Sequence, residues 1–116
     1  MRYMMLIYSD ETIETGRSQA ENEANFALYN TFTNEVRQRG NFRSGEALQP
    51  ATAATTVRVQ AGKTMAADGP FAATKEQLGG FYILDCQDLD EAIELAAKIP
   101  AAQEGAVEIR PIMELG

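Results

Sequence analysis

The sequence predicts an α+β domain in which an antiparallel sheet carries two helices on one of its faces. Two short runs, residues 2–8 (RYMMLIY) and 80–86 (GFYILDC), are apolar almost throughout, which is typical of central strands that are buried on both faces. Two longer stretches, after residues 18 and 87, repeat their apolar side chains with the period of a helix. The chain has 116 residues, so we expect one domain, residues 1–116, with a single core.

The first helix is predicted over residues 19–39, after a polar loop at residues 9–18. Ser18 stands three residues before Glu21, which is the spacing of a capping box, and Gly40 marks the end of the helix. The predicted buried stripe consists of Ala20, Ala24, Leu28, Phe32 and Val36, widened by Phe26 and Tyr29.

The middle of the chain predicts a weak edge strand followed by a hairpin. Residues 41–48 are short and mixed in character, and end at Gln49-Pro50. Residues 55–60 alternate apolar and polar side chains, Ala61-Gly62 is typical of a two-residue turn, and residues 63–67 form the return strand.

The second helix is predicted to begin at Asp88 and to end before Pro100. Asp88 and Glu91 again have the capping-box spacing. The expected buried stripe is Leu89, Ala92, Ile93, Ala96 and Ala97. A loop at residues 101–105 leads to the last strand, residues 106–113, in which apolar and charged side chains alternate.

This order of elements predicts a ferredoxin-like βαββαβ fold with an extra hairpin strand. Two helices cover only one face of such a sheet, yet both central strands are apolar on both faces. A second copy packed sheet to sheet would bury the remaining face, so we expect a homodimer with an isologous interface. A ligand or a different protein covering that face is the alternative.

The composition excludes several classes of function. The net charge is −7 and no basic cluster occurs, which argues against nucleic-acid binding. The chain has no histidine and a single cysteine, Cys86, so we expect no zinc site, no other metal site and no Ser-His-Asp or Cys-His nucleophile. No apolar run reaches the ~20 residues of a membrane span, and no signal peptide is evident, so we expect a cytoplasmic protein.

The densest cluster of turn formers and charges is residues 68–80 (DGPFAATKEQLGG). Asp68-Gly69-Pro70 is a turn sequence, and the Gly79-Gly80 pair leads into the second apolar strand. Such a loop in a short chain is where we expect a functional site.

The segments DGPFAATKEQLGGFYILD, DLDEAIELAAKIP and GAVEIRPI, with RYMMLIY and RSGEALQP, resemble the DGPF subgroup of the YCII-related family. The resemblance implies a ferredoxin-like fold that pairs into a dimeric α/β barrel. The wider family is similar to muconolactone isomerases, and some members use a His-Asp pair for acid/base chemistry on chlorinated aromatic breakdown products. This chain has no histidine, so only Asp68 resembles a part of that pair.

The resemblance also implies a partner. DGPF proteins are often encoded beside extracytoplasmic-function sigma factors, which implies a regulatory role and a sigma-factor partner.

Asp68 and Arg110 are the first candidate site residues. Asp68 is predicted as a general base if it is buried, or else as a cap of its own turn. Arg110 would bind a carboxylate inside a barrel, or else form an ion pair with Glu108 or Asp85. Arg58 is a similar candidate from a neighbouring strand, although we expect its side chain to face solvent.

The remaining candidates surround the same loop. Lys75 and Glu76 are predicted either to close over a pocket or to form a solvated patch. The hydroxyls of Tyr8 and Tyr82 would donate to a ligand or lie at the rim of the core. Phe71 is expected to plug the sheet edge and anchor the loop.

Two functions follow from these observations. The first is an uncharacterised small-molecule-binding or regulatory protein with an anionic-ligand pocket in the barrel. The alternative is a metal-independent isomerase or lyase in which Asp68 is the acid/base and Arg110 anchors a carboxylate substrate. No glycine fingerprint for a nucleotide occurs, so we expect no cofactor.

Overall fold

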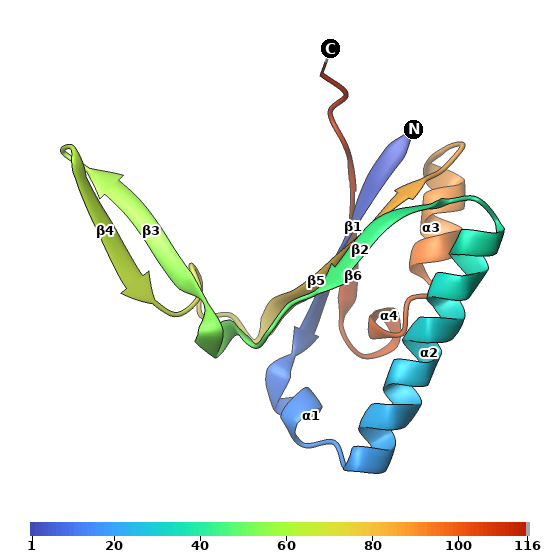
Figure 1. Cartoon of the computed structure of the whole chain (residues 1–116), viewed down its shortest axis with the longest axis horizontal. Helices are drawn as coiled ribbons and strands as arrows, with labels where there is room; N and C mark the ends of the chain where they lie inside the picture. Colours follow the sequence, from blue (N-terminus) through green and yellow to red (C-terminus); the bar gives the residue numbers. More distant parts are fainter. Residues whose placement is uncertain (116) are drawn as a thin grey trace.

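A four-stranded antiparallel sheet with the strand order β2-β5-β1-β6 organises the chain in the computed structural model, which describes residues 1–115 (Figure 1). Its strands are β1 (Arg2–Asp10), β2 (Phe42–Ala47), β5 (Glu76–Asp85) and β6 (Ala106–Pro111). Both long helices, α2 (Gln19–Gln38) and α3 (Leu89–Ala96), lie on one face of the sheet. This order and layering confirm the predicted ferredoxin-like α+β fold.

The core lies between this sheet and the two long helices. Alternate residues are buried there from residue 3 to residue 7 of β1 and from residue 80 to residue 84 of β5, as the alternation of a strand requires. The buried apolar side chains from the strands are Tyr3, Met5, Ile7, Tyr82 and Leu84; Phe32 and Val36 come from α2, and Ala92, Leu95 and Ala96 from α3.

The other face of the sheet is covered by no helix (Figure 1). We call this surface the open face; it consists of Met4, Leu6 and Tyr8 of β1 with Phe81 and Ile83 of β5, all of which are half-buried. The sequence predicted that a second layer is needed to bury this open face.

The local signals at the helix ends are confirmed. Ser18 and Glu21 form a reciprocal capping box at the start of α2. Asp88 accepts a hydrogen bond from the backbone N–H of Glu91 at the start of α3. Gly40, with a φ of 79°, follows the end of α2 in the left-handed region.

Three predicted boundaries are wrong. The predicted loop at residues 9–18 contains the end of β1 and a short helix, α1 (Glu11–Thr15), whose N-cap is Asp10. The predicted loop at residues 101–105 contains α4 (Ala101–Glu104). Strand β5 begins at Glu76 rather than at Gly80, because residues 76–78 pair with residues 8–10 of the extended β1.

The predicted stripe of α2 is only half buried. Phe32 and Val36 are in the core, but Ala20, Ala24 and Leu28 are exposed, and Phe26 is 68% exposed. The first half of α2 runs past the end of the sheet (Figure 1), which agrees with the exposure of these side chains.

The predicted stripe of α3 is rotated around the helix. Leu89 and Ile93 are each 51% exposed, and Ala97 is also exposed. Leu95 and Ile99, which the prediction did not include, are fully buried.

The hairpin does not add a strand to the main sheet. β3 (Thr55–Gln60) and β4 (Lys63–Asp68) pair only with each other and follow a short 3₁₀ helix, η1 (Ala51–Ala53). The predicted turn is confirmed: Ala61 and Gly62 have φ values of 50° and 76°. We call residues 55–68 the arm, because they project away from the body of the molecule (Figure 1).

Candidate functional site

An open hollow of about 580 Å³ lies at one end of the open face, where β1, β5 and β6 meet. Its lining comes from three separate parts of the chain: Tyr8 on β1, Thr74, Lys75 and Glu76 at the start of β5, and Ala106 and Glu108 on β6. It therefore contains one cation, two carboxylates and a phenol hydroxyl.

The hollow is organised by the pairing of β1 with β6. Tyr8 pairs with Ala106, and the Tyr8 hydroxyl donates to the Glu108 carboxylate over 3.4 Å. Gly105 permits this close approach, because a Cβ atom at that position would overlap the carbonyl oxygen of Tyr8. Gly105 thus lets β6 start directly beside the end of β1.

The segment that carries Lys75 is held in place by its own side chains. The Gln77 amide donates to the carbonyl oxygens of Ala72 and Thr74, at 3.0 and 2.8 Å. The hydroxyl of Thr74 donates to the carbonyl oxygen of Glu76 at 2.7 Å. Lys75 and Glu76, predicted either as a lid or as a solvated patch, are exposed and form one wall of the hollow.

Arg110 lies beside the hollow on β6, two residues beyond Glu108, so both point to the same face of the sheet. It is exposed, and no ion pair of Arg110 occurs within residues 1–115. Asp85, one of its two predicted partners, binds Arg43 at 3.1 Å instead. The cation of Arg110 is therefore available on the open face.

Tyr82 lies on the opposite face of the sheet from Tyr8. It is buried against the helices, with its hydroxyl 2.8 Å from that of Thr33 and its ring edge-on to Phe32 at 5.1 Å between centroids. One chain therefore does not bring the two predicted tyrosines into one site.

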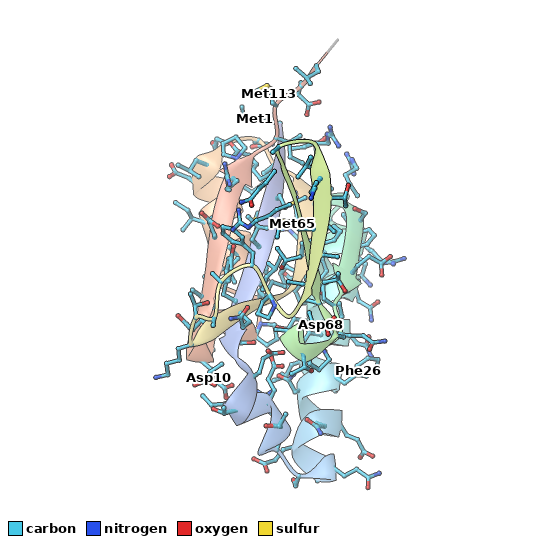
Figure 2. All side chains as sticks on the ribbon, turned by 90° about the vertical axis from the view of Figure 1, so that its left-hand side faces the viewer. Met1, Asp10, Phe26, Met65, Asp68 and Met113 are labelled. Atoms are coloured by element: carbon cyan, nitrogen blue, oxygen red, sulfur yellow. The ribbon has the colours of Figure 1, made fainter. Side chains whose placement is uncertain are left out.

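Asp68 is placed on the arm rather than in the hollow. It is the last residue of β4, exposed, at the base of the hairpin (Figure 2). The turn that follows is held by other groups. The backbone N–H of Gly69 donates to the carbonyl oxygen of Ala54 at 2.8 Å, and the hydroxyl of Thr56 donates to the carbonyl oxygen of Gly69 at 2.9 Å. Within the described part of the chain, its carboxylate makes no hydrogen bond of the kind a turn cap would make.

Phe71 does not plug the sheet edge, so that expectation is wrong. Its ring is 75% exposed and packs under the guanidinium of Arg58, 5.1 Å from the ring centroid. Arg58 of β3 thus gives the ring a cation to contact instead of a strand edge.

The place of Glu108 in the hollow was not predicted from the sequence, which indicated it only as an ion-pair partner. The available signal was the alternation of residues 106–110, which places Glu108 and Arg110 on one face of the last strand. Its neighbour Tyr8 lies 100 positions earlier in the chain.

Comparison with known proteins identifies the family. The model of the YCII-related domain matches residues 1–116. The chain belongs to the YCII-related family. An uncharacterised protein of Rhizobium meliloti (strain 1021) is 40% identical to this YCII-related protein over 114 residues, which is 97% of this chain and 92% of that protein.

Neither a metal cluster nor a membrane-spanning helix occurs in the described part of the chain. Residues 1–115 contain no group of three Cys, Asp or Glu side chains arranged to hold a metal ion. No helix in the same range is long and apolar enough to cross a membrane.

Proposed function

We propose that this YCII-related protein binds a small apolar molecule with an anionic group on its open face, as a homodimer in which a second copy covers that face. The observation that supports it most is the hollow at Tyr8, Lys75 and Glu108, which opens beside an apolar sheet surface. A ligand site normally combines apolar walls with a few polar groups that fix orientation.

Each group has a distinct role in this proposal. Lys75 and Arg110 attract and orient a carboxylate. The apolar part of the ligand packs on Leu6 and Phe81, and its hydroxyl or carbonyl meets the Tyr8 hydroxyl. Because the face is open in a single chain, these contacts remain screened by water until a second layer covers them.

A second copy supplies that layer most simply. Two sheets pack face to face about 10 Å apart. The half-buried apolar side chains Met4, Leu6, Phe81 and Ile83 fit such a contact. The single cysteine, Cys86, forms no disulfide within residues 1–115, which fits the cytoplasmic location that we propose.

The test is thermal unfolding against a panel of small lactones, muconates, hydroxy-aromatics and other carboxylates. A ligand present at 100 times its Kd adds about 2.7 kcal/mol to the free energy of unfolding, which raises Tm by many degrees for a domain of this size. The shift is expected to be lost in Arg110→Ala and Lys75→Ala. It should persist in Lys98→Ala, which removes an exposed cation from α3's C-terminal side. No shift with any compound would overturn the proposal.

A catalytic role is the second candidate, supported by the contact between the Tyr8 hydroxyl and the Glu108 carboxylate. In a metal-independent isomerase or lyase, Arg110 anchors the substrate carboxylate and a carboxylate base removes the proton next to a carbonyl. Glu108 lies in the hollow, whereas Asp68 lies on the arm. Glu108→Gln is therefore expected to abolish turnover, and Asp68→Asn to leave it within a few-fold. The reverse result would restore Asp68 as the acid/base.

A regulatory role is supported by the exposed stripe of Leu89 and Ile93 on α3, which lies away from the open face. Such a surface fits a protein partner, and a sigma factor is the partner that we propose for it. Capture of a sigma factor by the tagged protein, lost in Ile93→Asp, would support this role. A folded, ligand-binding protein that captures none would overturn it.

A further inference from the structure

The arm has an apolar face that no other part of residues 1–115 covers. Val57 and Val59 share one face of the hairpin with Ala66, which pairs with Val57. The two valines are 59% and 66% exposed. The opposite face carries Arg58, which pairs with the exposed Met65, and Gln60 and Lys63, which pair at the tip.

This pattern indicates a buried surface. A strand that alternates apolar and polar side chains is normally packed on one side only. A two-stranded hairpin without such packing is marginally stable in water at best. Its turn adds strain, because Ala61 is a non-glycine residue with a φ of 50°. The arm therefore requires a partner surface.

The placement of the arm indicates which surface this is. The arm leaves the lower end of the sheet on the side away from the helices (Figure 1), and it overlies the sheet when viewed from that side (Figure 2). The molecule is correspondingly 48 × 46 × 18 Å rather than rounded. A second copy that covers the open face lies in the space between sheet and arm.

The length of the arm is sufficient for this contact. Its strands have six residues each, which corresponds to about 20 Å. Two sheets packed face to face are about 10 Å apart. Each arm is long enough to cross the gap and to pack along the flank of the other copy.

The charge distribution fits the same partner. Residues 55–68 contain two of the ten cations, Arg58 and Lys63, and one acidic residue, Asp68 at the base of the hairpin. The remainder of the chain holds eight Lys and Arg against sixteen Asp and Glu. A basic arm is complementary to the acidic body of a second copy, and Glu46 and Glu108 rim its open face.

We infer that the arms are exchanged: the Val57–Val59 face of each copy packs across the other copy and closes the open face over the hollow. This inference rests on the homodimer of the proposed function. It adds that the site is incomplete without the arm of the partner, and that the arm, rather than the sheet face alone, sets the strength of the dimer.

The test is the double substitution Val57→Asp with Val59→Asp, followed by sedimentation velocity over a range of concentrations. The dissociation constant of the dimer is expected to rise at least about tenfold, since two carboxylates would be buried against an acidic, apolar surface. The matched control is Phe26→Asp, which places a carboxylate at an equally exposed position on α2. Both sites lie outside the core, so far-ultraviolet circular dichroism should show each variant folded.

The outcomes separate the two proposals. A dimeric wild type whose dissociation constant is unchanged in the double variant overturns the exchange of arms and leaves the homodimer intact. A wild type that is monomeric at all concentrations overturns the homodimer, and the exchange with it.

Amide hydrogen exchange provides a second measurement on the unmodified chain. The arm is expected to be protected at concentrations where the protein is dimeric and to lose that protection on dilution, while β1 and β5 keep theirs. Equal exchange of the arm amides in dimer and monomer would contradict the inference.

Discussion

The hydroxyl of Tyr8 donates to the carboxylate of Glu108 across the junction of β1 and β6, over 3.4 Å. The contact is long and exposed, so it stabilises the fold little. It lies beside Lys75 at the end of the open face, and for that reason we propose a functional rather than a structural role for it.

Tyr8→Phe should therefore separate stability from binding. We expect the free energy of unfolding to change by less than about 1 kcal/mol, because an exposed hydrogen bond is replaced by water. Ligand-induced stabilisation should fall severalfold, because the hydroxyl that orients the ligand is lost. Chemical denaturation with and without a ligand found in the panel measures both. Tyr3→Phe, on the helix-covered face of the same strand, is the control.

Gly105→Ala is expected to be among the most damaging single-methyl changes in the chain. The added Cβ would overlap the Tyr8 carbonyl oxygen, which belongs to the backbone and cannot rotate away. We expect a loss of roughly 2–4 kcal/mol in the free energy of unfolding, together with loss of the hollow.

The control for that change is Gly40→Ala. Gly40 has a φ of 79°, but a Cβ added there would meet no atom within 4 Å, so its cost is backbone strain alone, about 1 kcal/mol. Equal losses in the two variants, measured by urea denaturation, would show that the contact at Tyr8 relaxes freely.

Ala61→Gly is expected to stabilise the arm. Ala61 has a φ of 50° in a turn that favours glycine or asparagine, and glycine removes a strain of about 1 kcal/mol. Amides of β3 and β4 should exchange up to about fivefold more slowly. The opposite change, Gly62→Ala, adds strain at a φ of 76° and should speed exchange. Faster exchange in Ala61→Gly would contradict the assigned turn.

Stability should fall with acid partly through Glu35. Hydrogen bonds from Lys98 and, next, from Arg39 hold the pKa of its carboxylate below the ordinary value of 4.5. A lowered folded-state pKa stabilises the protein above pH 4.5, and this contribution is lost as the pH falls through the folded-state pKa. The pair is exposed, so the effect should be small and weaken with salt.

Glu35→Gln should remove the contribution of Glu35 to the acid sensitivity. Below pH 4.5, the Tm of this variant should therefore fall less steeply with decreasing pH than the Tm of the wild type. Glu23→Gln, on the same helix and without an ion pair in residues 1–115, should leave the fall of Tm unchanged. Identical Tm curves for wild type and Glu35→Gln would show that the bridge contributes nothing.

Local features were predictable from the sequence because their determinants lie within a few residues of each other. The capping box of Ser18 with Glu21 and the cap by Asp88 both span three positions, and the turn at Ala61-Gly62 involves adjacent residues. The continuous apolar character of residues 2–8 and 80–86 likewise indicated strands with apolar side chains on both faces, and the order of elements then left few topologies.

Side-chain environments were less predictable. The apolar periodicity of residues 19–39 predicted helix α2. It did not show that the first half of α2 passes the end of the sheet, where Phe26 is exposed. The environment of Tyr82 was not predictable from the sequence either. Which face of β5 carries Tyr82 depends on which alternate residues of that strand turn toward the helices.

The sequence by itself determined the long helices, the strands, their order and the family, since these depend on short-range chemistry and pattern, whereas the short helices α1 and α4 were missed. The tertiary structure alone decided the hollow and the arm. Tyr8, Lys75 and Glu108 meet only because β1 lies between β5 and β6, and such pairing between distant segments follows from burying one face of the sheet against the helices. The two strands of the hairpin pair with each other and with no strand of the main sheet in residues 1–115, so the apolar face of the hairpin stays exposed in a single chain.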